Sequence, residues 1–513
     1  MGIARSKGNR RALPIDALRH HESAATSLDG WGLQAMRESF LTMFNYSAGE
    51  AVNDAHSRLN PTCVRRVVPV RSLADARAAI AGAVPNESIC IAGARHAMGG
   101  QQFVEDGILL DTCAFDRVLS LDVERGLVEV ETGIRWPALI RQLGVLQRGR
   151  KDRGTIRQKQ TGADQLSIGG ALSANIHGRG LTMKPVIDDV ESFTLLDANG
   201  ELHRCSRTEN RELFRLAIGG YGLFGFIATA TLRLVRRRRL RRDVALATSG
   251  DLVHAFAERI AAGALYGDFQ FAIDPRSPDF LHRGILSTYT PVAAATRGAE
   301  PAPVLTADQW GELLVLAHVD KSRAFELYAA HYLATSGQEY WSDLHQLSIY
   351  LDDYHRAIDP CLTAHGYRDG GTEVITELFV PIGRLAEFLG NASEDLRRND
   401  VDVIYGTIRL IEPDDESFLP WARQRSACVI VNVHTPHSAA GLAHSAEALR
   451  RLIDLAIAQN GSYYLTYHRH ARHDQVLRCH PSLRAMLRRK REYDPDERFQ
   501  SEWYRWYREL LRV

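Results

Sequence analysis

Two glycine-rich segments about 70 residues apart are suited to holding a phosphate-bearing ligand. The first runs from Ile91 to Gly100 as IAGARHAMGG, and the second runs from Ser167 to Gly178 as SIGGALSANIHG. Glycines let backbone N–H groups approach phosphate oxygens closely, and they adopt positive φ without strain. We therefore expect two loops that grip a pyrophosphate from both sides. Neither segment matches GxGxxG or GxxxxGK[ST], which speaks against a Rossmann or P-loop site.

A third glycine-rich turn, GGYGLFGFI over Gly219 to Ile227, leads into a strand-like run at 228–235. Together, in this order and spacing, the three segments resemble the FAD-binding domain of the vanillyl-alcohol-oxidase (PCMH-type) flavoprotein family. The resemblance covers roughly residues 61–235 and is looser at the C-terminal end. Within that family, the chain is most similar to the sugar-alcohol and aldonolactone oxidases, whose first loop also carries a histidine after Gly-x-Arg. The resemblance implies FAD as cofactor.

His96 is the residue of the first loop whose predicted role is the most specific. The resemblance implies that it attaches covalently to the flavin 8α-methyl carbon, which requires a neutral imidazole nitrogen as nucleophile. The neighbouring cation Arg95 would raise the cost of the charged imidazole. The alternative is a histidine that only hydrogen-bonds within the turn, with FAD held non-covalently; we favour the covalent link. No cysteine lies near Ala163 and Asp164 in the second loop, so a second attachment is not expected.

The remaining cofactor contacts also follow from the resemblance. Glycines would let the backbone approach the cofactor, and Ser and Asn would donate to phosphate or ribose oxygens. The segment 160–162 would touch the flavin edge, Ile227 would meet adenine through its backbone, and His177 would lie near the ring system or behind it. The predicted cofactor-binding set is Gly93, Ala94, Arg95, His96, Ala97, Gly162, Ser167, Gly169, Gly170, Ser173, Asn175, His177, Gly178 and Ile227.

Arg409 and Glu377 are the catalytic candidates of the middle of the chain. In the sugar-alcohol oxidases a Glu-x-Arg pair lies over the flavin; this chain keeps Arg409 but has Thr407 in place of the glutamate, which puts a polyol substrate in doubt. Arg409 would orient a hydroxyl or carboxylate and stabilise the reduced flavin anion. The alternative is a structural ion pair between Arg409 and an acid at 412 or 414. For Glu377, the alternative is an exposed strand carboxylate.

His468, in the segment YLTYHRHARH over 464–473, is the third catalytic candidate. Related oxidases carry a basic residue in this region, and a neutral histidine could take a hydroxyl proton. The spacing of His468 and His470 also allows a metal site completed by His473 or His434. We expect no metal, because no carboxylate–histidine pattern supports one.

Composition sets further limits. The chain has 513 residues, a formal charge of +1 and seven scattered cysteines without a CxxC pair. Neither a disulfide framework nor a zinc knuckle is implied, which suits the cytoplasm. No run approaches the ~20 apolar residues of a membrane span. Gly2 with Ser6 fits the myristoylation pattern, but we interpret this end as a mobile leader.

Short strands, hairpins and single helices indicate an α+β fold. We expect strands at 67–70 and 88–92 around a helix capped by Ser72, with Val84 in its apolar stripe. Hairpins are expected at 118–131 and 193–204, and a helix between them from Pro137 to Gly144. A final helix capped by Ser501 would pack Trp503, Trp506, Tyr507 and Leu510 against the core.

The predicted organisation is a leader and helical segment (1–60, with a helix near 33–44), a PCMH-type FAD-binding domain of two α+β subdomains (61–240), an α+β substrate (cap) domain (243–455) and a C-terminal segment returning to the first domain (456–513). The arginine run Arg236–Arg242 would be the exit from the FAD domain, as a solvated strand or linker. Its alternative is a nucleic-acid-binding patch.

The predicted function is an FAD-linked oxidase or dehydrogenase that oxidises a CH–OH group of a sugar, lactone or similar polar alcohol. A small-molecule substrate and oxygen or another electron acceptor would be its partners, without nucleic acid. A sterol or prenyl-sugar dehydrogenase or reductase is the enzymatic alternative. A nucleic-acid-associated protein that uses Arg236–Arg242 is the alternative of another class.

Overall fold

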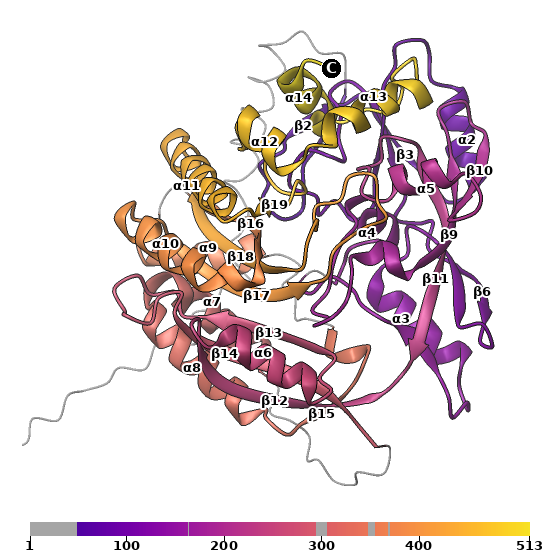
Figure 1. The fold of residues 1–513 in the computed structure, drawn as a ribbon. Coiled ribbons are helices and arrows are strands. Elements are labelled where there is room, and N and C mark those ends of the chain that lie inside the picture. The colour runs from indigo at the N-terminus through magenta and orange to yellow at the C-terminus, as the bar shows by residue number, and fades with distance from the viewer. Residues whose placement is uncertain (1–48, 163, 294–304, 347–353, 368–369) are drawn as a thin grey trace, which may run out of the picture. The chain divides into compact units, whose positions relative to one another are not determined.

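The computed structural model describes residues 49–162, 164–293, 305–346, 354–367 and 370–513 (Figure 1). The leader, the helix expected near 33–44, the Gly2 and Ser6 pattern and Ala163 lie outside the described residues. Residues 50–513 form one compact unit, to which all elements below belong. Its mixture of helices, antiparallel sheets and one small parallel sheet confirms the predicted α+β class.

A three-stranded parallel sheet carries the first glycine loop. Its order is β3 (Arg66–Pro69), β5 (Ile108–Asp111) and β4 (Ile89–Ala92), and a short hairpin of β1 (Glu50–Val52) and β2 (Thr62–Val64) precedes it. Helix α2 (Leu73–Ala81) begins at Ser72, whose hydroxyl accepts from Asp75 N in the expected capping box. Pro69 lies on edge strand β3, as expected of a residue without an N–H group.

The second sheet carries the other two glycine segments. Its order is β10 (Leu202–Ser206), β9 (Val190–Leu196), β11 (Phe226–Arg236), β7 (Leu127–Glu131) and β6 (Val118–Asp122), with β8 (Gly154–Ile156) beside β11. Both predicted hairpins are present, and their turns follow the expected residues. Helices α3 (Trp136–Leu146), α4 (Ile168–Ala174) and α5 (Arg211–Ala217) and the short η2 (Val186–Asp189) complete this part.

The third sheet forms the other half of the unit (Figure 1). Its eight strands run in the order β15 (Glu339–Trp341), β12 (Arg239–Thr248), β14 (Arg283–Val292), β13 (Tyr266–Phe271), β17 (Val403–Ile411), β18 (Ser426–Pro436), β16 (Gly371–Pro381) and β19 (Ser462–Tyr463). Around it lie α6 (Leu252–Ala261), α7 (Ala307–Val319), α8 (Lys321–Ala334), α9 (Tyr354–Ala364), α10 (Leu385–Arg398) and α11 (Ala439–Ala458), with η3 (Leu344–Gln346) and η4 (Ile382–Arg384).

One face of the third sheet packs against helices, and the other face lines a cavity. Helices α10 and α11 contact strands β16 and β18, and Leu378 and Val429 belong to the core cluster on that side. Because strand side chains alternate, the neighbouring Glu377 and Ile430 point to the opposite face. That opposite face lines a large cavity.

The C-terminal segment returns to the first sheet, as expected. It comprises α12 (His473–Cys479), α13 (Leu483–Tyr493) and α14 (Glu502–Leu511). The backbone N–H of Ile89 in β4 donates to Arg498 O at 2.6 Å, which joins the segment to the strand that leads into the first glycine loop. In Figure 1 its yellow helices lie beside the indigo N-terminal part of the unit.

Some local expectations were wrong. Val84 lies beyond the end of α2 and is 56% exposed, so it is no part of the apolar stripe. Helix α3 continues past Gly144 to Leu146. In α14, capped by Ser501, Trp506 is 45% exposed and Tyr504 takes its place in the core. Successive side chains of an α-helix point about 100° apart, so the buried stripe can include Tyr504 in place of Trp506 while the helix itself is as predicted.

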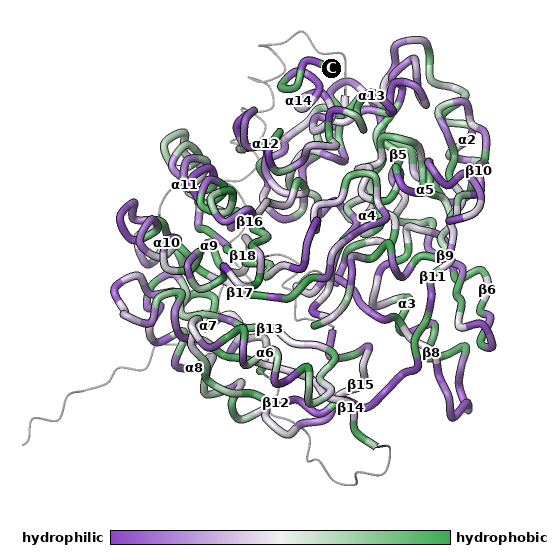
Figure 2. Tube along the Cα trace, in the orientation of Figure 1, coloured by the Kyte–Doolittle hydropathy of each residue, from purple (hydrophilic) through white to green (hydrophobic). Residues whose placement is uncertain are grey.

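The arginine run spans the crossing from β11 to β12, a hydrophilic stretch in Figure 2. It is not simply solvated. Arg237 pairs with Asp343 at 2.7 Å, and Arg239 pairs with Glu339 at 3.0 Å. Arg242 is buried, donates to Ser287 Oγ at 2.8 Å and stacks on Tyr332. These three guanidinium groups therefore have partners within the fold, which weakens the nucleic-acid interpretation of the run.

Candidate active site

One cavity of about 720 Å³ brings most of the predicted residues together. Its volume is in the range of small-molecule and cofactor sites. The two glycine loops and the third glycine turn form one part of its wall, and the open face of the third sheet forms another. The predicted residues in the lining are Gly93, Ala94, Arg95, His96, Ala97, Gly162, Ser167, Gly169, Gly170, Ser173, Ile227, Glu377 and Arg409.

The first and second glycine loops touch each other. A Cβ placed on Gly93 would lie 2.2 Å from Ser167 Oγ, so only glycine permits this approach. Gly93 directly follows β4, and Ser167 is the N-cap residue of α4, where its hydroxyl accepts from Gly170 N. The loops that the sequence places about 70 residues apart are thus one contiguous wall.

The second loop is tied to the turn after β7. Ile168 N donates to Ile134 O at 2.9 Å, and Gly169 N donates to Thr132 O at 2.7 Å. A Cβ on Gly169 would meet Thr132 at 3.1 to 3.3 Å, so this glycine also permits a close approach. Backbone bonds of this kind hold the loop in place without using its side chains.

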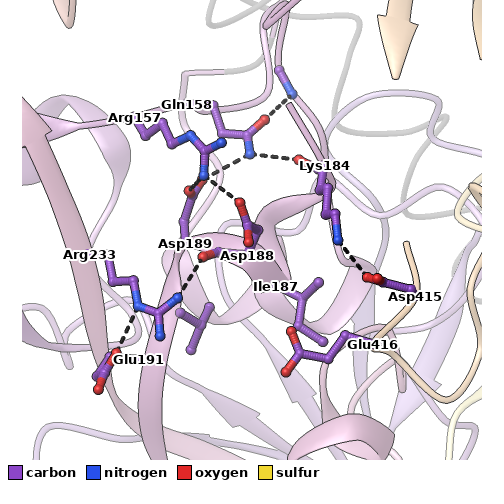
Figure 3. Close-up of polar contacts among 12 residues, drawn as sticks. Arg157, Gln158, Lys184, Ile187, Asp188, Asp189, Glu191, Arg233, Asp415 and Glu416 are labelled. Atoms are coloured by element: carbon purple, nitrogen blue, oxygen red, sulfur yellow. Dashed lines mark hydrogen bonds and ion pairs between the residues drawn. The ribbon is translucent and has the colours of Figure 1, made fainter. Parts of the chain in front are cut away.

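A polar network behind the second loop holds the segment that follows it (Figure 3). Arg157 pairs with Asp188 at 2.5 Å and with Asp189 at 3.1 Å. Gln158 donates to Asp189 Oδ2 at 2.9 Å and accepts from Gly178 N at 3.2 Å. Burial raises the pKa of Asp189 to about 6, against the opposing effect of Arg157.

The network also ties the cavity lining to the third sheet. Next along the chain, Lys159 is fully buried and pairs with Asp164 at 2.6 Å; burial lowers the pKa of Lys159 to about 8 against that ion pair. Gln160, Thr161 and Gly162, which follow, line the cavity; their contact with the flavin edge stays a prediction. Lys184 reaches Asp415 beyond β17 at 2.6 Å (Figure 3).

Glu377 is the centre of a buried hydrogen-bonded group. His177 Nε2 lies 2.8 Å from Glu377 Oε2, Tyr467 donates its hydroxyl to Glu377 Oε1 at 2.5 Å, and Cys428 Sγ lies 3.5 Å from Oε2. Burial opposes ionisation of Glu377, but His177 and Tyr467 together hold its pKa below the usual value. The exposed-carboxylate alternative is therefore wrong, since Glu377 is 4% exposed.

Arg409 lies beside this group on the same face. In the pairing of β17 with β18, Arg409 lies opposite Cys428 and Thr407 lies opposite Ile430. On the other side of β18, Ile430 lies opposite Glu377 of β16. Arg409 is buried, lines the cavity, and its Nε has no hydrogen-bond partner among the described residues. The expected alternative, an ion pair at 412 or 414, is not formed: Glu412 pairs with Arg425, and Asp414 accepts from Asn175 and Ser417.

His468 does not reach the cavity lining, unlike its neighbour Tyr467. Its Nε2 lies 3.2 Å from Ser57 Oγ, and its ring stacks on His470. Burial and the neighbouring His470 lower the pKa of His468 to about 3, so it is uncharged near neutral pH, but it is not placed to reach a substrate in the cavity. Among the described residues His468 and His470 belong to no set of three close donor atoms, and His434 packs against His318.

Three residues of the predicted cofactor set stand behind the wall rather than in it. Asn175 is fully buried in a left-handed conformation and donates to Asp414 at 2.9 Å, so its side chain serves the fold. Gly178 donates to Gln158, and His177 contacts Glu377 instead of the lining. For His177, the structure agrees with the alternative of a histidine behind the ring site.

The sequence interpretation missed Tyr467, which joins Glu377 to the cavity wall. It stands in the same segment as His468, which follows β19 as turns and bends and not as a strand, so no period of the sequence indicates which of its side chains faces the cavity. It also missed Gln270 and Asn432, polar lining residues of β13 and β18. Nothing local distinguishes these two from ordinary strand residues.

The residues of the loop wall fit FAD. Gly93 and Gly169 let the two loops and the turn at Thr132 pack closely into one wall, and Gly162, where nothing lies within 4 Å of a Cβ, leaves room in the lining. The buried Thr161 Oγ1 lines the cavity without a hydrogen-bond partner, as expected where a polar ligand completes the site.

Comparisons with known proteins agree with this geometry. Residues 64–206 match the family described as FAD binding domain. The chain is 30% identical over 211 residues to an uncharacterized oxidoreductase of the fasciation locus of Rhodococcoides fascians, which covers 38% of this chain and 44% of that protein. It is 29% identical over 182 residues to L-gulonolactone oxidase of Bos taurus, covering 35% and 38%.

A third relative is L-gulono-1,4-lactone dehydrogenase of Mycobacterium tuberculosis, 30% identical over 142 residues that cover 27% of this chain and 32% of that protein. The chain thus matches less than half the length of each of these relatives. No helix in the described part of the chain is both long and apolar enough to cross a bilayer. Residues 64–206 are therefore an FAD-binding domain of the PCMH-type flavoprotein family, and FAD is the cofactor of this chain.

Proposed function

We propose that this protein is an FAD-dependent oxidoreductase that oxidises a CH–OH group of a small molecule. The observation that carries the proposal is the continuity of one cavity from the glycine loops to the sheet face that holds Glu377 and Arg409. The names of the relatives, a lactone oxidase and a lactone dehydrogenase among them, agree with this reaction class.

Bound FAD supplies an acceptor for the hydride that leaves a hydroxyl-bearing carbon. Residues of the two glycine loops, Gly93 and Ser167 to Gly170 among them, would hold it. The chain must then take up the hydroxyl proton. Glu377 is the group placed for this, because it lines the cavity and its hydrogen bonds with His177 and Tyr467 hold it in the ionised form, which can accept a proton. Tyr467 orients the carboxylate through its 2.5 Å hydrogen bond and also lines the cavity.

Arg409 would orient the substrate. Its unpaired Nε is a buried donor in the lining, and a buried donor without a partner costs roughly 1–3 kcal/mol. A hydroxyl or carboxylate oxygen of the substrate would remove that cost. We therefore assign Arg409 to substrate positioning and Glu377 to proton uptake, and we no longer assign His468 a catalytic role.

His96 would carry the covalent flavin link. It lines the cavity in the first loop, as the resemblance implies. The expected help from Arg95 is reduced, because Arg95 pairs with Asp111 at 3.0 Å and its charge is partly balanced.

The proposed reaction is tested by mixing purified holoprotein without oxygen with a panel of alcohols, lactones and hydroxy acids. Bleaching of the visible flavin absorbance by at least one CH–OH compound is the expected result. Admitting air afterwards separates an oxidase, whose flavin reoxidises faster than turnover, from a dehydrogenase that requires another acceptor. A flavin that no member of the panel bleaches would contradict the proposal.

A further inference from the structure

The part of the cavity lining that comes from helices α7 and α8 has a different chemistry from the sheet face. Helix α7 turns Trp310, Leu313, Leu314 and Ala317 into the lining. Their spacing, i, i+3, i+4 and i+7, is that of one helix face. Such a face normally packs into a core. Here Trp310, Leu313 and Leu314 are only half-buried, and His318 is the one buried residue among those of α7 whose side chains are described.

Helix α8 adds a second face of the same kind. Ala324, Phe325, Tyr328, Tyr332 and Thr335 line the cavity, and Tyr328 stacks on Tyr332 with ring centroids 4.2 Å apart. Two neighbouring helices thus direct apolar and aromatic side chains into one chamber. We call these lining residues of α7 and α8 the apolar wall.

The apolar wall is held against the sheet. At the junction of the two helices, Lys321 donates to Val403 O in β17 and pairs with Asp402 at 2.8 Å, while Ser322 donates to Asp274 at 2.7 Å. In Figure 1 both helices lie beside the strands β12 to β17. The position of the wall relative to the polar sheet face is therefore built into the fold.

The sheet face opposite offers hydrogen-bonding groups. Arg409 Nε, Gln270 Oε1 and Asn432 Oδ1 are buried without hydrogen-bond partners among the described residues, and all three residues line the cavity. They include donors and acceptors, which suits a ligand end that carries hydroxyl groups. One chamber thus has a polar side and an apolar side.

We infer that the substrate is amphipathic: a hydroxylated compound whose other end is a planar apolar group, aromatic or conjugated, that packs on the apolar wall. Removing such a group from water contributes roughly 25 cal/mol per Å² of buried apolar surface, and contact with the rings of Tyr328 or Trp310 favours a flat group. The wall is mostly apolar, with Tyr328 Oη and Trp310 Nε1 as buried polar atoms that have no hydrogen-bond partner among the described residues, so a fully hydroxylated sugar would use little of it. The inference rests on the proposed function, because it assigns the ligand as the substrate.

The experiment compares two alcohols, cinnamyl alcohol and xylitol, as ligands of the holoprotein. Binding is read from the change in protein fluorescence of holoprotein whose flavin has first been photoreduced under anaerobic conditions, so that no hydride can be transferred. We expect cinnamyl alcohol to bind at least roughly tenfold more tightly than xylitol, which corresponds to about 1.4 kcal/mol. Tighter binding of xylitol, or no response to cinnamyl alcohol, would overturn the inference.

Leu313→Asp tests the wall directly. It should weaken binding of cinnamyl alcohol by roughly tenfold without loss of FAD. Val319→Asp is the matched control, because Val319 lies on the same helix, is 37% exposed and does not line the cavity. Its binding of cinnamyl alcohol should be unchanged. If Leu313→Asp bound cinnamyl alcohol as tightly as the parent protein, the apolar wall would not be the surface that contacts the ligand.

The two proposals fail in different ways. If cinnamyl alcohol binds as expected but no CH–OH compound bleaches the flavin, the proposed reaction is wrong while the binding chemistry stands. If xylitol or a sugar lactone binds more tightly and bleaches the flavin, the reaction stands and the amphipathic substrate is wrong. Should Leu313→Asp fail to fold, the comparison of the two alcohols on the parent protein still decides.

Discussion

His177 Nε2 lies 2.8 Å from Glu377 Oε2, although the two residues are 200 positions apart in the chain. The other ring nitrogen, Nδ1, is 3.0 Å from the carbonyl oxygen of Gly178. A carbonyl only accepts, so Nδ1 carries a hydrogen. The contact between Nε2 and Oε2 works against burial in holding the pKa of Glu377 below its usual value. The FAD-binding half thus supplies the group that sets the protonation of Glu377.

Replacing His177 should change the pH dependence of the reaction. Without the imidazole, burial would raise the pKa of Glu377. Glu377 takes up a proton only when ionised, so activity is lost as pH falls through its pKa. In His177→Ala the acidic limb of the flavin-reduction rate should therefore move upward by about one pH unit or more.

Rapid-mixing measurements over pH 4–9, with any compound that bleaches the flavin, check this shift. His203→Ala is the matched control, because His203 also pairs with a carboxylate, Asp197, at 2.8 Å, but outside the cavity. An acidic limb that stays in place in His177→Ala would show that the pair does not control Glu377.

Gly93→Ala should weaken FAD binding. Its methyl group would lie 2.2 Å from Ser167 Oγ, so the two loops must separate. We expect FAD affinity to fall roughly tenfold or more, measured by fluorescence titration of apoprotein in a His96→Ala background, in which the covalent link cannot form. Adding Ser167→Gly to Gly93→Ala removes the hydroxyl that the new methyl group meets, so the double variant should recover part of the FAD affinity.

Gly144→Ala is the control for that experiment, since nothing lies within 4 Å of a Cβ there and the residue is inside helix α3. It should bind FAD as the parent protein does and be up to about 1 kcal/mol more stable. If Gly93→Ala bound FAD as tightly as the parent protein, FAD binding would not depend on the close approach of the two loops.

Flavin should remain attached to the polypeptide after acid precipitation of the parent protein, because we propose a covalent link through His96. In His96→Ala the acid should release the flavin into the supernatant. The measurement is flavin fluorescence on the washed pellet and on a denaturing gel. Acid-stable flavin in His96→Ala would place the link elsewhere, and flavin released from the parent protein would mean that FAD is held non-covalently.

Protonation of the buried His468 ring should destabilise the fold at acidic pH. Burial, with His470 beside it, lowers its pKa from 6.5 to about 3. A depressed pKa means that the stability is present above pH 6.5 and is lost as pH falls toward 3. The free energy of unfolding should therefore decline by up to about 1.4 kcal/mol per pH unit from this residue.

Urea unfolding at several pH values between 7 and 4 measures that slope. His468→Gln should show a flatter dependence, because glutamine does not titrate, and flavin reduction should remain close to that of the parent protein. A large loss of flavin reduction with FAD still bound would return His468 to the catalytic residues.

The cofactor half could be predicted because its signals are local. Glycines at 93 and 169 mark close approaches of the backbone to its neighbours, and Ser72 and Ser501 cap helices through neighbours three residues away. These features depend on a few adjacent residues, so type and spacing suffice. Covalent attachment through His96 stays a prediction.

The substrate half depends on pairing between distant strands. The choice of His468 over Tyr467 followed chemical type, whereas the orientation of each side chain is set by how the segment after β19 passes the sheet. Asn175 was assigned to the cofactor by resemblance, but its partner Asp414 lies 239 positions away. Contacts across such separations leave no trace in a single sequence.

The most direct test of the central claim compares flavin reduction in the parent protein and in Glu377→Gln, with the same bleaching compound under anaerobic conditions. The account predicts that Glu377→Gln retains its full complement of FAD and reduces it roughly 100-fold or more slowly, because a positioned base contributes about 10²–10⁴-fold. Equal rates of flavin reduction in the two proteins would contradict the account.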